Sequence, residues 1–398
     1  DVQQVCCGFD SIASDIRLQF RLATRTPFGE CTNGIDRIRS IETFVGDDGS
    51  KLNSWNASQY LNVWVVNSME NGVAGYAYLP ASISGFMSLA DGVIILYNYI
   101  GRLPPASEAY SRALTHEIGH YLNLEHPWGN TNSPGVACGD DLVEDTPITK
   151  GWDHCPTPAQ SRVCTPGVYE NFENYMDYSY CSKMFTKGQC SRMRATLAQA
   201  IAYRNNLYNS DNLVATGVAD GHQYSCAPKA DFYPDSRFTC AGDQVAFKDN
   251  SGNGVVTSWL WHFQDGEPST STDQNPTVTF TSAGYKTVTL TVSNSVGVNT
   301  LTLDSAVRVA PEANELYWLT EDFTDLGRYQ RWGSENHEHN NSFWSYAPNA
   351  GYGGGGCARL NAFQQESLND LIIDDQFTGR APGNDIDELV SPTIDLSG

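Results

Sequence analysis

One short stretch constrains this chain more than any other feature. Residues 116–129 read HEIGHYLNLEHPWG, in which His116 and His120 lie four positions apart. On a helix, this spacing places both imidazoles on one face, one turn apart, so that two ring nitrogens can reach a single zinc ion. The pattern therefore predicts a helix over residues 107–124, for which Ser107 is suited as the N-cap.

A third histidine, His126, can reach the same ion only if the helix stops and the chain turns back. Asn123 stands at this point, and Asn is, after Gly, the residue that best tolerates the left-handed conformation of a helix exit. Glu117 follows the first histidine, where its carboxylate can reach a metal-bound water without binding the metal. Three protein ligands and one open position are typical of catalytic zinc sites. The alternative is a surface helix with incidental histidines.

The overall composition limits the partners of the chain. It carries 46 acidic and 24 basic side chains and a formal charge of −22, a balance that disfavours nucleic acids and anionic lipids. No apolar run approaches the roughly 20 residues that span a bilayer. The 11 cysteines are spread along the chain rather than clustered in CxxC pairs, which favours disulfides and an oxidising compartment outside the cell.

Patterning divides the chain into three domains and a linker. Residues 1–212 combine the histidine helix with strand-like runs and a second helix, expected over residues 187–207. Residues 213–228 form a linker, and residues 229–311 contain only short alternating strands, which predicts a β-sandwich. Residues 312–398, rich in aromatic strands, form the last domain. The strand-like runs of the first domain are residues 15–24, 60–68, 72–80 and 91–100.

The same motifs resemble those of a known protein family. HEIGHYLNLEHPWG resembles the HExxHxxGxxH signature of the metzincin metallopeptidases, with Asn123 in the glycine position, and NYMDYS supplies the Met-turn. The ordered motifs FRLATRTPFG, LNVWVV, GYAYLP, DGVII and DDLVEDTP are similar to the pappalysin family, in its bacterial cytophagalysin branch, over residues 15–193. The resemblance implies an α+β catalytic domain, with a twisted mixed sheet, an active-site helix and a loop-rich lower subdomain.

The resemblance also implies roles for individual residues. His116, His120 and His126 would bind zinc, and Glu117 would act as general base and acid on a zinc-bound water that attacks a peptide carbonyl. Met176 would lie beneath the metal. Tyr178 would stabilise the oxyanion, the alternative being an ordinary buried tyrosine. The strand that pairs with an extended peptide substrate would comprise Gly75, Tyr76, Ala77 and Tyr78.

Disulfides and calcium complete the expected first domain. By the same resemblance, Cys138 pairs with Cys164 and Cys155 with Cys181. A calcium ion is implied near DDLVEDTP, where a solvated acidic turn is the alternative. Its oxygen ligands would come from Asp140, Asp141, Asp145 and Thr146. A disulfide from CCG at residues 6–8, for which Cys31 is a candidate partner, is favoured over a cysteine bound to zinc. The pairing of Cys6, Cys7, Cys31, Cys190 and Cys357 stays open.

The remaining regions resemble accessory modules. Residues 229–311, with WHFQDG near their centre, resemble a PKD-type immunoglobulin-like domain, in which Trp261 and Phe263 face the core and Cys226 pairs with Cys240. Residues 312–398 resemble the N-terminal part of an adhesin-type jelly-roll domain. These resemblances imply that a first strand and helix of the metzincin fold are missing before residue 1, and that the natural protein continues beyond residue 398.

Two functions fit the whole chain. The first is a secreted or cell-surface bacterial zinc endopeptidase that cleaves extracellular proteins, with zinc and calcium as its metal ions. The second is a cell-surface adhesion or assembly component in which the peptidase domain is an inactive or latent scaffold. In both, the C-terminal domains are where a cell-surface or secretion-machinery partner would bind. The intact ligand set and Glu117 favour the first function, because a scaffold has no need of a general base.

Overall fold

The structure is a computed structural model of the chain. It describes residues 5–38, 40–69, 72–101, 103–107, 110–129, 131–221 and 225–310, together with four short strands farther along, at 333–336, 344–347, 357–360 and 387–390. Among these residues, no helix is both long enough and apolar enough to cross a membrane. A mixed sheet with neighbouring helices in one part and a β-sandwich in another make the fold class α+β, as predicted.

The chain forms two compact units whose boundaries differ from those expected. The first unit comprises Asp1–Ala23, Pro27–Gly29 and Glu42–Asp220, and the second comprises Thr24–Thr26, Glu30–Ile41 and Gly221–Gly398. A segment near the N-terminus therefore belongs to the unit that contains the β-sandwich. The expected boundary near residue 212 separates only the longer parts of the two units.

Within the second unit, a disulfide between Cys31 and Cys226 joins this early segment to the later part of the chain. The predicted Cys226–Cys240 disulfide is therefore wrong. Cys240, the last residue of strand β7 (Phe238–Cys240), has a free, exposed thiol, since Cys226 is already bonded to Cys31. Cys6 and Cys7 form a disulfide with each other rather than with Cys31.

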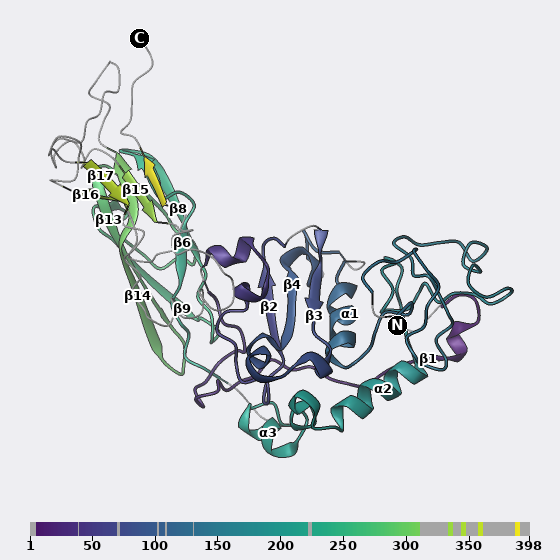
Figure 1. Ribbon diagram of the computed structural model, residues 1–398. Helices are drawn as coiled ribbons and strands as arrows, with labels where there is room; N and C mark the ends of the chain where they lie inside the picture. Colours follow the sequence, from purple (N-terminus) through teal and green to yellow (C-terminus); the bar gives the residue numbers. More distant parts are fainter. Residues whose placement is uncertain are drawn as a thin grey trace, which may run out of the picture. The chain divides into compact units, whose positions relative to one another are not determined.

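The central element of the first unit is a three-stranded mixed sheet. Its strand order is β2-β4-β3, with β2 (Asn62–Val66) parallel and β3 (Gly75–Ala77) antiparallel to β4 (Gly92–Leu96). The β-branched run in β4 suits a central strand, and Val93, Ile94 and Ile95 are fully buried. Figure 1 shows helix α1 (Arg112–Tyr121) alongside β3 and β4, which places the histidines beside the edge of this sheet.

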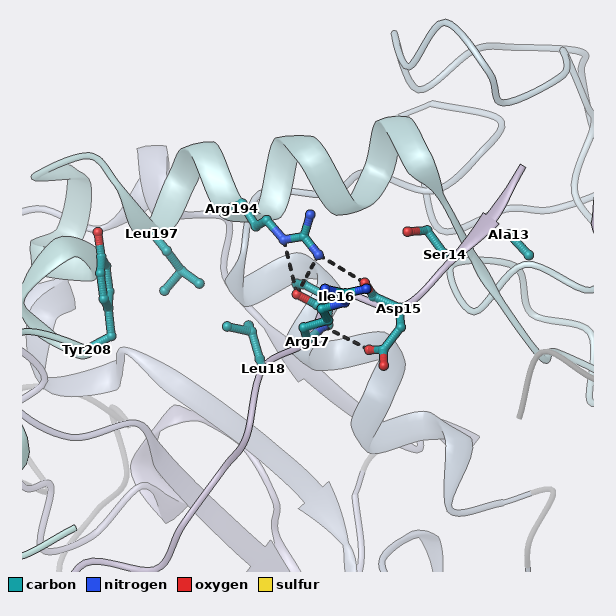
Figure 2. A pocket seen from close by; sticks show the side chains of 9 residues that line it. All are labelled: Ala13, Ser14, Asp15, Ile16, Arg17, Leu18, Arg194, Leu197 and Tyr208. Atoms are coloured by element: carbon teal, nitrogen blue, oxygen red, sulfur yellow. Dashed lines mark hydrogen bonds between the residues drawn. The ribbon is translucent and has the colours of Figure 1, made fainter. Parts of the chain in front are cut away.

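The run 15–24 does not form the expected strand. Only β1 (Ala13–Ser14), just before it, pairs, with β5 (Phe185–Thr186). Figure 2 shows the reason: the guanidinium group of Arg194 donates hydrogen bonds to the carbonyl oxygens of Asp15 and Ile16, which a neighbouring strand would otherwise use. A cavity of about 660 Å³ adjoins this segment, and no histidine lines it.

Both predicted helices are shorter than expected. Helix α1 begins at Arg112, and Ser107 instead accepts a 3.3 Å hydrogen bond from the Tyr110 amide within a preceding turn, so the N-cap prediction is wrong. Helix α2 (Lys187–Leu197) begins with a capping box between Thr186 and Gln189.

Helix α2 does not continue to residue 207. It ends at Leu197, and the short 3₁₀ segment that follows, Ile201–Asn206, is interrupted at Ala202 and Tyr203, whose φ values are 44° and 59°. This break places Arg204 in the protein interior, where it binds Asp91 with two hydrogen bonds of 2.7 Å. A short helix α3 (Ser210–Ala215) follows.

The second unit contains the predicted β-sandwich. One sheet has the order β10-β12-β8-β6 and the other the order β11-β9-β13-β14-β7. Their buried faces share one apolar core, to which Trp261 and Phe263 contribute as predicted. The strands are β6 (Phe232–Pro234), β7 (Phe238–Cys240), β8 (Gln244–Asp249), β9 (Ser258–Phe263), β10 (Gly266–Glu267), β11 (Thr270–Ser271), β12 (Thr277–Phe280), β13 (Gly284–Ser293) and β14 (Val298–Ala310).

Beyond residue 310, two antiparallel ladders are described. They pair β15 (Gly333–Asn336) with β18 (Asp387–Val390), and β16 (Trp344–Ala347) with β17 (Cys357–Leu360). The predicted jelly-roll domain at residues 312–398 otherwise lies outside the described residues.

Candidate metal centre

Helix α1 ends in a tight turn that brings the third histidine back toward the first two. Asn123 has φ 72°, in the left-handed region. Its amide donates to the carbonyl of His120 at 2.9 Å, and the Leu124 amide donates to the carbonyl of Gly119 at 2.9 Å. These two bonds define a Schellman motif, in which Asn123 takes the position that glycine most often occupies. The side chain of Leu124 is fully buried and anchors the turn.

The three histidines converge on one point. The Nε2 atoms of His116 and His120 are 3.1 Å apart, those of His120 and His126 also 3.1 Å, and those of His116 and His126 3.3 Å. Among the described residues, this is the one group of three or more acidic, histidine or cysteine side chains whose ligand atoms are close enough to hold a metal ion.

The opposite nitrogen of each ring is held by a backbone carbonyl. The Nδ1 atoms of His116, His120 and His126 lie 2.8, 2.7 and 2.8 Å from the carbonyl oxygens of Tyr175, Leu124 and Thr131 respectively. A carbonyl can only accept, so each Nδ1 carries the proton and each Nε2 has a free lone pair. Burial lowers the pKa of all three rings, that of His126 to about 3, which keeps the lone pairs available at neutral pH.

This arrangement fits zinc. Three nitrogens at about 2.05 Å from one ion, at tetrahedral angles, lie about 3.3 Å from one another. The three lone pairs would repel each other at the observed separations without a cation between them. Backbone carbonyls on the opposite nitrogens are the partners that metal-binding histidines usually have, because they fix the tautomer and the ring orientation.

Glu117 projects from the same helix and is almost completely buried. Burial raises its pKa to about 8, although a hydrogen bond from the Ala77 backbone acts in the opposite direction. The carboxyl group is thus in contact with strand β3. A buried carboxyl with a perturbed pKa, on the helix that carries two of the three converging histidines, is a candidate for a general base.

Met176 lies directly against helix α1 and is fully buried. A methyl group on Gly119 would clash with the sulfur of Met176, so the glycine in HEIGH allows the close approach. The Asn174 side chain accepts a hydrogen bond from the Met176 amide at 2.9 Å and donates to Gln189 of helix α2 at 2.9 Å. The methionine turn is therefore fixed between both helices.

Tyr178 lies beside two of the three histidines. Its ring centroid is 4.8 Å from that of His126 and 5.5 Å from that of His116, and 40% of its surface is exposed. Burial and the nearby Glu117 raise its pKa to about 12, so the phenol keeps its proton and can donate a hydrogen bond at neutral pH. Its hydroxyl lies 3.5 Å from the side-chain oxygen of Asn132.

The carboxylates of Asp140, Asp141 and Asp145 do not all lie within 4.8 Å of one another, so a calcium ion at this loop would be bound by only part of the predicted ligand set. The carboxylate of Asp145 accepts hydrogen bonds from Thr186 and Gly188, at 2.6 and 2.9 Å, and so caps helix α2. Burial raises the pKa of Asp141 to about 7, and the buried hydroxyl of Thr146 has no hydrogen-bond partner. Asp140 accepts from the Leu142 amide at 2.7 Å.

The loop that supports the site is cross-linked twice. Disulfides join Cys138 to Cys164 and Cys155 to Cys181. Both pairings are those that the resemblance implied.

Two residues of the site escaped the sequence analysis. Trp128 stacks on the His126 ring, at 4.7 Å between centroids and 3° between planes, and its indole donates at 3.0 Å to the same Thr131 carbonyl that His126 contacts. Arg204 donates at 3.1 Å to the carbonyl of Tyr121, the last residue of α1. The proximity of Trp128 to His126 in the sequence could have indicated the stacking contact. No neighbouring residues in the sequence indicate the contact between Arg204 and Tyr121.

Comparison with known proteins agrees with this geometry. The model of the pregnancy-associated plasma protein-A family matches residues 45–198, and the model of the PKD domain matches residues 225–309. An extracellular metalloprotease of Arthroderma benhamiae is 33% identical over 150 residues, which cover 37% of this chain and 50% of that protein. The chain thus spans about half the length of this curated relative.

Solved structures show similar proteins for each unit. Mature mirolysin of Tannerella forsythia, in complex with a cleaved peptide, is 34% identical, with 53% of this chain and 82% of that chain covered and a TM-score of 0.45. The PKD1 domain of the Vibrio cholerae metalloprotease PrtV is 32% identical, with 21% and 99% covered and a TM-score of 0.18. By its family matches, this chain contains a metallopeptidase domain of the pappalysin family followed by a PKD domain.

Proposed function

We propose that this protein is a secreted zinc endopeptidase that hydrolyses peptide bonds of extracellular proteins. The observation that carries the proposal is the convergence of three histidine Nε2 atoms within 3.1–3.3 Å, with the buried carboxyl of Glu117 on the same helix. Relatives named as extracellular metalloproteases and four disulfides support secretion.

The metal would be held by His116, His120 and His126. When bound, zinc would polarise the scissile carbonyl and lower the pKa of a water molecule toward about 7. Glu117 would accept a proton from a water molecule in the site and later give it to the leaving amine. A cation beside Glu117 also counteracts the effect of burial on its pKa, which favours the ionised form that a base needs.

Two further groups would act on the peptide. Tyr178 keeps its proton at neutral pH and is exposed at the mouth of the site, where its hydroxyl can donate to the oxygen that becomes negatively charged. Strand β3 lies at the edge of its sheet within the described residues, so an extended peptide can add to it through backbone hydrogen bonds.

We also propose that the loop at residues 140–146 binds calcium. The raised pKa of Asp141 and the unpartnered hydroxyl of Thr146 support a cation there, because oxygen ligands suit calcium. If so, calcium should raise the midpoint of thermal unfolding of the wild-type protein, and Asp141→Asn should abolish this rise. A midpoint that does not respond to calcium contradicts the assignment.

The decisive experiment measures hydrolysis of an unfolded protein substrate by the full chain. Glu117→Gln should lower kcat/KM by about 10²–10⁴-fold while the protein still binds one zinc ion. Asp211→Asn, which removes an exposed carboxylate of the same unit outside the loop 140–146, should have no effect. Removal of zinc with a chelator should abolish activity, and added zinc should restore it. If the zinc-loaded wild type is inactive, the scaffold function replaces this proposal. If Glu117→Gln is fully active, Glu117 is not the general base and the proposed mechanism fails.

A further inference from the structure

A partly buried polar cluster adjoins strand β3. The carboxylate of Asp48 accepts one hydrogen bond on each oxygen, from the hydroxyls of Tyr76 and Tyr78, both at 2.7 Å. The ammonium group of Lys51 lies 2.8 Å from the same carboxylate. We name these four residues the Asp48 clamp.

Lys51 connects the clamp to the rest of the sheet. Its ammonium group lies 4.5 and 4.7 Å from the ring centroids of Tyr76 and Tyr78, and it donates at 2.9 Å to the carbonyl of Ala90, just before β4. Only 1% of the Lys51 side chain is exposed. The clamp therefore joins the segment around Asp48, the beginning of β4 and the edge strand β3.

The clamp holds the residues on either side of Ala77, which contacts Glu117. Tyr76 lies in β3 and Tyr78 directly follows it. Side chains alternate along a strand, so Tyr76 and Tyr78 share one face and Ala77 points to the other. Ala77 packs against the apolar cluster of helix α1, and its backbone makes the hydrogen bond to Glu117. A shift of either tyrosine would therefore move the backbone that meets the catalytic helix.

The bonding of the tyrosines also limits what they can do directly. Both hydroxyls are used by Asp48, and Tyr76 and Tyr78 are only partly exposed. Burying a lysine beside a carboxylate is seldom the most stabilising solution for a protein, because apolar side chains of similar volume serve as well or better. Fixed geometry is what such hydrogen bonds add.

We propose that the Asp48 clamp is a positioning device for the peptidase reaction: through Tyr76 and Tyr78 it holds Ala77 against Glu117 and fixes the outer edge of β3 for an extended peptide. The proposal rests on the proposed function. Asp48 and Lys51 act through the strand and do not touch the substrate.

The test is steady-state kinetics of the full-length double variant Tyr76→Phe/Tyr78→Phe, with an extended, internally quenched peptide as substrate. The variant keeps both rings and removes only the hydroxyls. Rates are calculated per folded, zinc-loaded molecule, from the zinc content and the folded fraction. We expect KM to rise about tenfold and kcat to fall, because the edge strand is no longer fixed.

Two variants serve as matched controls. Tyr208→Phe removes the hydroxyl of an exposed tyrosine in the same unit and should leave both constants unchanged. Asp48→Asn keeps one carbonyl acceptor and should give an intermediate KM. If KM and kcat per folded, zinc-loaded molecule equal those of the wild type in the double variant, the clamp is only structural and the proposal is overturned.

A second measurement separates this proposal from the proposed function. Hydrogen exchange of the segment 73–79 should be faster in the double variant than in Tyr208→Phe. If the zinc-loaded wild type has no peptidase activity, the proposed function fails and the positioning role fails with it, whereas faster exchange would still show that the clamp holds β3. If exchange in this segment is unchanged, the clamp itself is refuted, whatever the activity.

Discussion

The β-sandwich and the metal-binding unit are stabilised in different ways. In the sandwich, alternating residues of both sheets enter one apolar core, in which Trp261, Phe247 and Leu290 are fully buried. In the first unit, the described residues between Tyr121 and Phe185 contain no helix or strand. In an apolar core, each side chain contacts many neighbours, so another apolar side chain of similar volume can take its place. A loop that is fixed by a few polar groups depends on each of those groups.

Glu170 illustrates the second case. It is 1% exposed and accepts hydrogen bonds from the side chains of Thr149 and Trp152, at 2.7 and 3.1 Å, and from the amides of Val163 and Cys164, at 2.9 and 3.0 Å. Burial raises the pKa of Glu170, but these hydrogen bonds outweigh it and the pKa lies below its usual value. Much of the loop that supports the metal centre is thus organised around one carboxylate.

The strongest test of the contrast is therefore Glu170→Ala. It should lower the free energy of unfolding by about 5 kcal/mol, because it leaves several buried donors without an acceptor. In the wild type, the stabilisation from this carboxylate should be complete above pH 4.5 and lost as the pH falls through its lowered pKa. Calorimetry between pH 2 and pH 7, at values chosen about one unit apart, measures both effects. A change below about 1 kcal/mol would contradict the contrast.

The sandwich should tolerate change at fixed volume. Leu290→Ala should cost about 3 kcal/mol through the cavity that it leaves, whereas Leu290→Met should cost less than about 1.5 kcal/mol. Urea unfolding of the second unit measures both. Zinc content should be unaffected by either substitution, and an equal cost for both would show that the sandwich core is as specific as the loop.

Gly119→Ala tests an apolar contact within the first unit. The added methyl group meets the sulfur of Met176, so we expect a loss of about 2 kcal/mol and weaker zinc binding. The double variant Gly119→Ala/Met176→Ala should recover part of the zinc affinity, as measured by competition with a chromogenic chelator. If the single variant binds zinc like the wild type, the helix and the methionine turn are less tightly packed than the structure indicates.

Asn123 should show the smallest effect. Asn123→Gly should leave stability within about 0.5 kcal/mol of the wild type, because glycine adopts φ 72° without strain, and Asn123→Ala should cost about 1 kcal/mol. Thermal unfolding of the zinc-loaded protein compares the two. If alanine were tolerated as well as glycine, the left-handed turn would not be what delivers His126.

The same contrast explains what could be predicted from the sequence. The three histidines could be predicted as a group because they lie within eleven positions, where helix periodicity and one turn residue determine the geometry. The sandwich could be predicted because apolar and polar residues alternate along its strands. In contrast, Arg204 meets Asp91 across 113 residues, and Cys31 meets Cys226 across 195. Neither pair has a local pattern, because the contacts form only after the intervening chain has folded.

Errors of prediction had the same origin. Residues 15–24 alternate like a strand, but Arg194 takes two of their carbonyl groups. The second helix was expected to reach residue 207, and no Gly or Pro interrupts residues 198–207, yet the chain breaks at Ala202 and Tyr203 and Arg204 is buried. Local propensity was overruled in both cases by an arginine whose partners lie far away in sequence.

The Cys31–Cys226 disulfide has a consequence for how the two units are joined. The polypeptide passes several times between the two units. It enters the second unit after residues 23, 29 and 220, and it returns to the first unit at residues 27 and 42. Cleavage of the chain at residue 221 would therefore leave the fragments covalently linked until the disulfide is reduced. A single cut on the N-terminal side of Cys226 in the linker therefore does not release the PKD domain while the disulfide is intact.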